Sequence, residues 1–173
     1  MLYERQDTYI DLARVVAVSE IRTGGGMRDE GGRFNITLTG IEHGLWIKAA
    51  DKSPQAAMAL ETDREGLLAN WRRYKSARPG GEKSVYALGH FHINLLAVSA
   101  LTGMQSVHHG TLMGCATAPA WPSYTVYVAG MRDAIVRRAG HEVADEAVLL
   151  QERQDLLSAW SGVHAPTLRK GAA

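Results

Sequence analysis

The chain has 173 residues, with 19 basic and 18 acidic side chains that give a formal net charge of +1. Hydrophobic residues make up 46% of it and charged residues 21%, which argues against disorder and is typical of one ordinary domain or of two very small domains that share a core. The balanced charge argues against a general attraction to nucleic acid or to an anionic membrane, so neither is expected as a partner.

The N-terminal segment 1–12, MLYERQDTYIDL, is charged and lacks the apolar core of a signal peptide. No run in the chain approaches the length of about 18 apolar residues that indicates a membrane-spanning helix. Cys115 is the only cysteine, which excludes an intramolecular disulfide and fits a reducing compartment. We therefore expect a cytoplasmic protein.

Short strands are predicted in the first half of the chain. A strand around Ile10 ends at Asp11, whose side chain can accept a backbone N–H and turn the chain. A second strand follows in VVAVSEI (15–21). Segment 34–40 alternates large apolar residues with polar or small ones and ends in glycine, which is typical of a half-buried strand leading into a hairpin. Segment 44–50 returns as its antiparallel partner, and 56–61 is expected to form a further short strand.

A helix is predicted to begin at Thr62-Asp63-Arg64-Glu65, which reads as a capping box: the Thr hydroxyl and the Glu carboxylate each accept a backbone N–H of the first turn. Apolar residues then recur on one side of the helix, at Leu67, Leu68, Trp71 and Tyr74. This stripe is expected to cover the strands, with Trp71 in the core.

The second half of the chain repeats the first. The aligned segments are 2–18 with 85–101 (offset 83), 33–40 with 123–130 (offset 90) and 63–71 with 152–160 (offset 89). They pair Ile10 with Ile93 and Trp71 with Trp160, and the offset changes only where loops belong. The second copy is expected to form strands over 98–104, 124–130, 133–139 and 146–151, and a helix that ends at Gly162.

We therefore predict an α+β fold: a tandem duplication of a small antiparallel β-sheet unit followed by one C-terminal helix, with the two copies packed together. The predicted parts are a first unit (1–77), a linker (78–84), a second unit (85–162) and a tail (163–173). A unit of about 75 residues buries a marginal core alone. The two copies are therefore expected to support each other, with Trp71 and Trp160 buried.

Two histidines, His90 and His92, stand two apart, and alternation along a strand would place both on one face. A third ligand completing a zinc-type site could come from His108, His109 or Cys115. The aligned positions of the first copy hold Asp7 and Tyr9, so the strand exists there without a metal-ligand pair. We interpret the histidines as exposed or hydrogen-bonded groups, and expect no metal or other cofactor.

Two equivalent loops differ between the copies, and loops on a rigid sheet commonly carry recognition. The loop over 22–33 holds five glycines. The connection between the second and third strands, which includes the loop over 107–123, has seven extra residues in the second copy. Candidate binding residues in them are Arg22, Arg28, Arg33, His108, His109 and Trp121. Backbone amides and arginines of the first loop could hold an anion, although the Walker lysine and the following helix are missing. Trp121 could form a protein contact, or fold back as a lid on the sheet.

The leading hypothesis from the sequence is a non-catalytic binding protein of bacterial or phage origin, of the inhibitor, adaptor or immunity type, that holds a protein partner through these unequal loops. A first alternative is a protein that binds a small ligand, a nucleotide or another anion, in the cleft between copies or protomers. A second is a metalloenzyme built on the histidines. No GxSxG elbow or positioned Cys-His motif is present, so we do not expect an enzyme. Homo-oligomers are expected, because sheet edges need cover.

Overall fold

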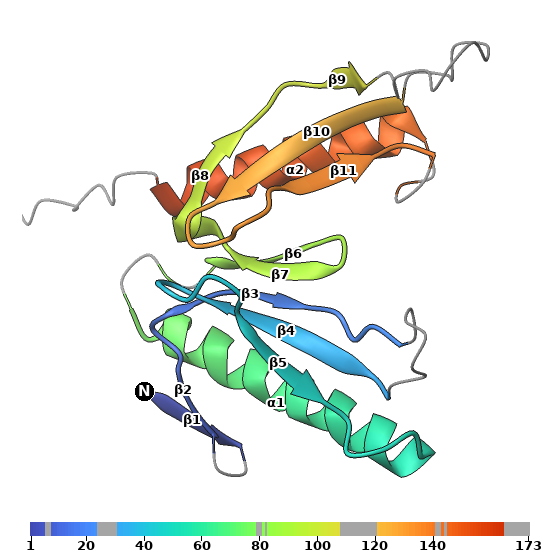
Figure 1. The fold of residues 1–173 in the computed structure, drawn as a ribbon. Coiled ribbons are helices and arrows are strands. Elements are labelled where there is room, and N and C mark those ends of the chain that lie inside the picture. Colours follow the sequence, from blue (N-terminus) through green and yellow to red (C-terminus); the bar gives the residue numbers. More distant parts are fainter. Residues whose placement is uncertain are drawn as a thin grey trace, which may run out of the picture.

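The computed structural model describes residues 1–5, 8–23, 31–78, 81, 83–107, 121–140, 143 and 145–164, and has an α+β fold (Figure 1). The first unit comprises β1 (Leu2–Arg5), β2 (Thr8–Asp11), β3 (Val15–Ser19), β4 (Arg33–Leu38), β5 (Leu45–Lys48) and α1 (Pro54–Ser76). The second unit comprises β6 (Val85–Leu88), β7 (Phe91–Asn94), the 3₁₀ turn η1 (Leu95–Ala97), β8 (Val98–Leu101), β9 (Gln105–Val107), β10 (Trp121–Val128), β11 (Ile135–Arg138) and α2 (Glu146–His164). Each unit is thus antiparallel strands followed by one long helix.

The strands form three antiparallel sheets. The central sheet has the order β5-β4-β3-β7-β6, so the β6–β7 hairpin of the second unit extends the sheet of the first. A second sheet has the order β11-β10-β8, with β9 also paired to β10. The β1–β2 hairpin is a separate two-stranded sheet. The two units are therefore joined by the pairing of β3 with β7 (Figure 1).

The strand pairing repeats between the units at the sequence offsets. Leu2 pairs with Asp11 in the first hairpin, and their counterparts Val85 and Asn94 pair in the second. The registers of β4 with β5 and of β10 with β11 correspond in the same way, as do those of β3 with β4 and of β8 with β10. These repeated registers are compatible with the predicted duplication.

Two local predictions are confirmed in both units. The Asp11 carboxylate accepts the backbone N–H of residue 13 at 3.0 Å, and the Asn94 side chain accepts that of Leu96 at 3.1 Å. Gly40 and Gly130 adopt positive φ angles of 79° and 90° at the turns that follow β4 and β10. A left-handed backbone favours glycine, which explains why this residue type stands two residues after each strand.

The two cores meet at β3. Val15 and Val18 lie in the first core, beneath α1, whereas Val16 and Ala17 join the second core. All five residues of β3 are buried, so this strand shows a continuous apolar run rather than alternation. Trp71 is fully buried in the first core as predicted, while Trp160 is half-buried at the edge of the second.

The predicted start of the first helix is wrong, and so is the strand predicted over 56–61. Helix α1 begins at Pro54, and Ser53 caps it by accepting the backbone N–H of Ala56 at 3.1 Å. Ser followed by Pro is a strong N-terminal signal, because the hydroxyl satisfies an amide and Pro needs no acceptor. Thr62 lies inside the helix, where its hydroxyl donates to the Met58 carbonyl at 2.9 Å.

The predicted bounds of the second helix are also wrong. Residues 146–151 form its first turns rather than a strand, with the Asp145 carboxylate accepting the backbone N–H of Val148 at 2.9 Å. The helix continues past Gly162 to His164. Packing of Trp160 and Val163 against the second core outweighs the cost of glycine in a helix, which is about 1 kcal/mol.

Candidate functional site

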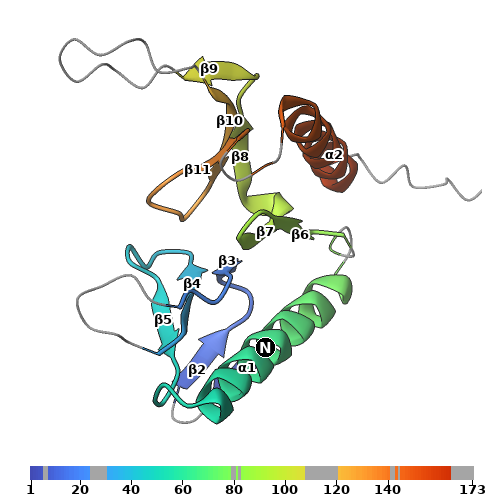
Figure 2. The same ribbon diagram turned by 90° about the vertical axis from the view of Figure 1, so that its right-hand side faces the viewer.

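A cleft of about 480 Å³ lies between the two units. It is bounded by the β4–β5 hairpin, the β6–β7 turn and the β10–β11 hairpin, whose turn points toward the first unit (Figure 2). The first unit lines it with Ser19, Arg22, Asn35, Thr37, Glu42, His43, Gly44 and Trp46. The second unit contributes His90, Phe91, Met131, Arg132, Asp133, Ala134, Ile135, Val136 and Arg137. We call this the inter-unit cleft.

The sheet wall of the cleft follows from strand alternation. Phe34 and Ile36 of β4 are buried in the first core, so Asn35 and Thr37 face the other side, toward the cleft. On β5, Ile47 is buried and Trp46 faces outward with 43% of its surface exposed. The outer face of the sheet therefore presents polar side chains and one exposed indole.

Two predicted binding residues, Arg22 and Arg33, lie beside this indole. They are cross-strand neighbours: the Arg22 N–H donates to the Arg33 carbonyl at 2.8 Å, and the Arg33 N–H donates to the Arg22 carbonyl at 3.0 Å. The Arg33 guanidinium carbon lies 5.1 Å from the centre of the Trp46 ring, within cation–π range. Arg22 and Trp46 thus line the cleft, and Arg33 neighbours both of them.

The opposite wall and the turn of the β4–β5 hairpin add charge of both signs. Arg132 and Asp133 are exposed residues of the β10–β11 turn, while Glu42 and His43 lie in the β4–β5 turn. His90 is held by Glu20, whose Oε2 lies 2.6 Å from the imidazole Nδ1. Exposed guanidinium groups thus stand on both sides of the cleft, at Arg22 and Arg132.

A third arginine of the cleft, Arg137, is only 5% exposed, and its guanidinium group stabilises the wall of the cleft. Its Nε and Nη2 donate to the two carboxylate oxygens of Glu152 on α2 at 2.9 and 2.7 Å, and the Tyr124 hydroxyl donates to the same carboxylate. Burial opposes the charge on Glu152, but the hydrogen bonds from Arg137 and Tyr124 outweigh it and lower its pKa. This network ties the second sheet to its helix.

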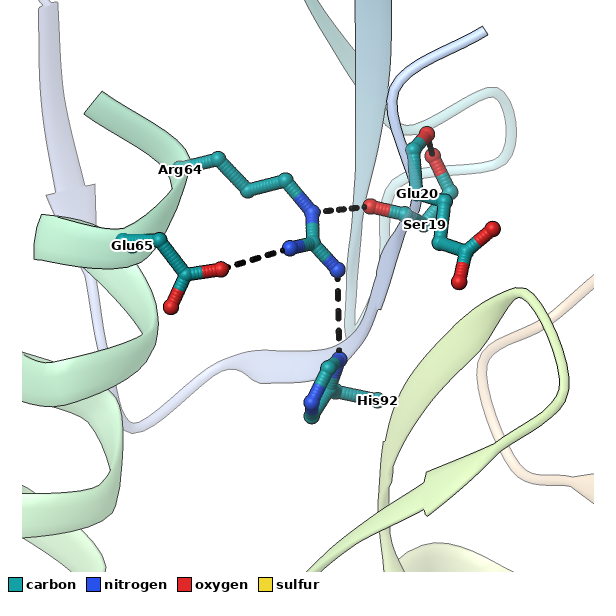
Figure 3. A network of polar contacts seen from close by, with 5 residues as sticks. All are labelled: Ser19, Glu20, Arg64, Glu65 and His92. Carbon is teal, nitrogen blue, oxygen red and sulfur yellow. Dashed lines mark hydrogen bonds and ion pairs between the residues drawn. The ribbon is translucent and has the colours of Figure 1, made fainter. Parts of the chain in front are cut away.

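His92, one of the two histidines singled out from the sequence, contacts a buried arginine (Figure 3). The Arg64 guanidinium donates to the Ser19 carbonyl at 2.8 Å, pairs with Glu65 at 2.9 Å and lies 3.3 Å from the His92 Nδ1. Burial, then the positive charge of Arg64, lowers the pKa of His92. A neutral imidazole that accepts the Arg64 hydrogen bond fits this environment, and makes His92 part of the junction between β3 and β7.

Four of the remaining predicted site residues lie outside the described residues: Arg28, His108, His109 and Cys115. Trp121 begins β10 and is half-buried, with its ring against Gly140. Within the described ranges, no group of three or more His, Cys, Asp or Glu side chains is placed to hold a metal ion. His90 lies in the β6–β7 turn and His92 on β7, and their contacts are with different elements.

The sequence reasoning missed Trp46, His43 and Arg132. The signal for Trp46 was present: it stands next to the apolar Ile47 on a predicted strand, so alternation places it outward, and an outward-facing tryptophan marks a contact surface. The two turn residues carry no comparable signal, because their proximity depends on how the units pack.

Comparisons with protein-family models, curated proteins and solved structures found no match. In the part of the chain that the structure describes, neither helix is long and apolar enough to cross a membrane. The inter-unit cleft is the concave site for which the described residues provide both charged groups and an exposed aromatic ring.

Proposed function

We propose that this protein is a binding protein whose ligand occupies the inter-unit cleft, and that the ligand is a small anion with a planar ring, of the kind represented by a nucleoside monophosphate. The observation that carries the proposal is the exposed Trp46, which lines a cleft of about 480 Å³ together with Arg22 and has the Arg33 guanidinium over its ring. Small-molecule sites are typically concavities of about 300–1,000 Å³ with a few placed polar groups.

The planar part of the ligand is assigned to Trp46. An indole exposed on a sheet face offers its ring for stacking, and the Arg33 guanidinium nearby is itself planar. Stacking of a base on an aromatic side chain contributes about 1–3 kcal/mol. Asn35 and Thr37 stand on the adjacent strand, where an amide and a hydroxyl can bond to the ring edge.

The anionic part is assigned to Arg22 and Arg132. Both side chains are exposed and line the cleft from different units, so an anion placed between them would meet two guanidinium groups. Glu42 and Asp133 lie in the facing turns and would disfavour anions placed close to them. Repulsion by these two carboxylates restricts the positions that a phosphate group can occupy in the cleft.

The other two functional hypotheses stay predictions. The protein-partner hypothesis depends on the loops over 22–33 and 107–123, of which 24–30 and 108–120 lie outside the described residues. The metalloenzyme hypothesis depends on His108 and His109 as well as His90 and His92. The inter-unit cleft, by contrast, is lined by described residues whose side chains can bind an anion and a planar ring.

Calorimetric titration with AMP and, separately, with inorganic phosphate tests the proposal. We expect AMP to bind more tightly than phosphate, because only AMP stacks on Trp46. Since a hydrogen bond to a charged group contributes about 1.5–3 kcal/mol, Arg22→Ala should weaken AMP binding by roughly ten- to hundredfold, and Arg132→Ala likewise.

Matched variants separate stacking and charge from loss of structure. Trp46→Phe should retain most of the affinity and Trp46→Ala should lose it, and Arg73→Ala, an exposed site on α1 away from the cleft, should bind like the wild type. Equal binding of AMP and phosphate would contradict the role of Trp46. Absence of AMP binding, or binding unaffected at Arg22, Arg132 and Trp46, would contradict the proposed function.

A further inference from the structure

The junction between the two units provides a template for contact between two copies of the chain. In this junction the β6–β7 hairpin pairs with the outer edge of β3, with Ala17 opposite Ile93 and Val18 opposite His92. The pairing covers β3 completely, since Val16, Ala17 and Val18 are each at most 2% exposed. The junction thus consists of one unit's sheet edge and the other unit's hairpin.

The counterpart of β3 in the second unit is β8, and its outer edge is uncovered. Val98, Ala100 and Leu101 pair with β10 as Val15, Ala17 and Val18 pair with β4. Yet β8 is the last strand of its sheet, and no described residue pairs with its other edge. Ser99 and Ala100 are exposed there, whereas their counterparts in β3 are buried.

The counterpart of the β6–β7 hairpin is the β1–β2 hairpin, which has the same internal register. Among the described residues, β2 pairs only with β1, so the edge that β7 presents to β3 is unpaired in β2. Tyr9, in the position of His92, is 62% exposed. The hairpin is already held on α1, where the Tyr3 hydroxyl donates to the Asp63 carbonyl, so it can pair without refolding.

We propose that the uncovered edge of β8 binds the β1–β2 hairpin of a second copy of this chain. Among its described residues, each copy of the chain has an uncovered edge at β8 and a hairpin, β1–β2, with an unpaired edge. These correspond to the edge of β3 and to the β6–β7 hairpin, which pair with each other at the internal junction. Figures 1 and 2 place β2 and β8 on opposite sides of the central sheet, so the two meet only between copies. Unpaired strand edges favour such pairing by main-chain hydrogen bonds.

The internal junction also fixes the register of the proposed contact. Transferring it by the repeat offsets places Ala100 opposite Ile10 and Leu101 opposite Tyr9. The helix environment also corresponds: Arg64 bonds to the Ser19 carbonyl beside His92, and Arg153 bonds to the Thr102 carbonyl at 2.8 Å, beside the place that Tyr9 would take. Such a contact is head-to-tail, so it continues into a closed ring or an open filament.

Light scattering coupled to size-exclusion chromatography tests this proposal on the full chain over a range of concentrations. We expect oligomers in the wild type and monomers in Ala100→Lys. Ala100 is exposed in a single copy, so lysine is tolerated there, but its counterpart Ala17 is fully buried at the junction. Ala69→Lys, on the exposed surface of α1, is the matched control and should assemble like the wild type. A monomeric wild type, or an Ala100→Lys chain that still assembles, would overturn the proposal.

Disulfide trapping tests the register independently of any change in stability. A Tyr9→Cys chain and a Leu101→Cys chain, both carrying Cys115→Ser, should form a mixed disulfide when oxidised together, because opposite residues of paired strands lie within disulfide range. Tyr9→Cys mixed with Ala69→Cys should not. Equal trapping with both partners would contradict the register. Tyr9, Leu101 and Ala69 do not line the inter-unit cleft, so the outcome is separate from that of the ligand titrations.

Discussion

Replacing Glu152 with alanine should destabilise the fold by removing the carboxylate that pairs with the buried Arg137. Arg137 is 5% exposed, and both of its hydrogen bonds to Glu152 are shorter than 3 Å. Removing one member of a buried ion pair costs about 3–5 kcal/mol, because the other charge stays buried and uncompensated. The Glu152 side chain retains 24% of its exposure, so water can reach part of the site and we expect a loss of about 3 kcal/mol.

Urea unfolding followed by circular dichroism measures this loss. With an m-value of about 2 kcal/mol/M, which is typical of chains of this size, a loss of about 3 kcal/mol lowers the midpoint by about 1.5 M. Asp155→Ala is the matched control on the same helix: this carboxylate is exposed and accepts a hydrogen bond from Gln151. An exposed change of this kind should alter stability by less than about 0.5 kcal/mol.

A double variant separates the electrostatic cause from loss of packing. Arg137→Met with Glu152→Leu removes both charges and keeps apolar volume. Both this double variant and Glu152→Ala lose the hydrogen bond from the buried Tyr124 hydroxyl, which costs about 1–3 kcal/mol, so we expect the double variant to be more stable than Glu152→Ala but to stay below the wild type. If the double variant were as unstable as Glu152→Ala, an unpaired charge would not explain the loss. A change of less than about 1 kcal/mol in Glu152→Ala would equally refute the reasoning.

Two further predictions concern the first helix and the junction beside it. Ser53→Ala should cost about 1 kcal/mol in urea unfolding because it removes the cap of α1, whereas Thr62→Ala, inside the helix, should cost much less; equal losses would contradict the observed helix start. The lowered pKa of His92 means that the unfolded chain binds a proton more readily than the folded one once the pH falls below about 6.5, so stability is full above that pH and declines below it. His92→Gln should reduce this decline between pH 7.5 and pH 5, and an unchanged decline would exclude His92 as its source.

The α+β fold and most strands could be predicted because they depend on local pattern, and the strand registers are compatible with the predicted duplication. Segment 34–40 alternates and ends in a glycine with positive φ, and Asp11 and Asn94 both accept a backbone N–H as expected. The start of α1 could also have been predicted, because Ser53 followed by Pro54 is a local signal for the beginning of a helix. The sequence Thr62-Asp63-Arg64-Glu65 has the residue types of a capping box but lies inside the helix, and it led to a predicted helix start that is too late.

The inter-unit cleft could not be predicted from local pattern. It exists because the β6–β7 hairpin pairs with β3 of the other unit, and no residue of the hairpin specifies that choice by itself. The apolar run Val15–Val18 is the sequence feature that reflects this pairing, because β3 is buried on both faces and Val16 and Ala17 belong to the second core. Arg22 could be identified as a candidate from its loop, but its position near Trp46 and across from Arg132 depends on tertiary packing.

Nuclear magnetic resonance mapping of AMP on the ¹⁵N-labelled protein tests the central claim most directly, because it locates a ligand as well as detecting it. If the inter-unit cleft is the binding site, the amides of Arg22, Asn35 and Arg132 and the indole N–H of Trp46 should shift together along one saturating curve. Shifts confined to α1 or α2, or no shift at saturating AMP, would contradict the claim.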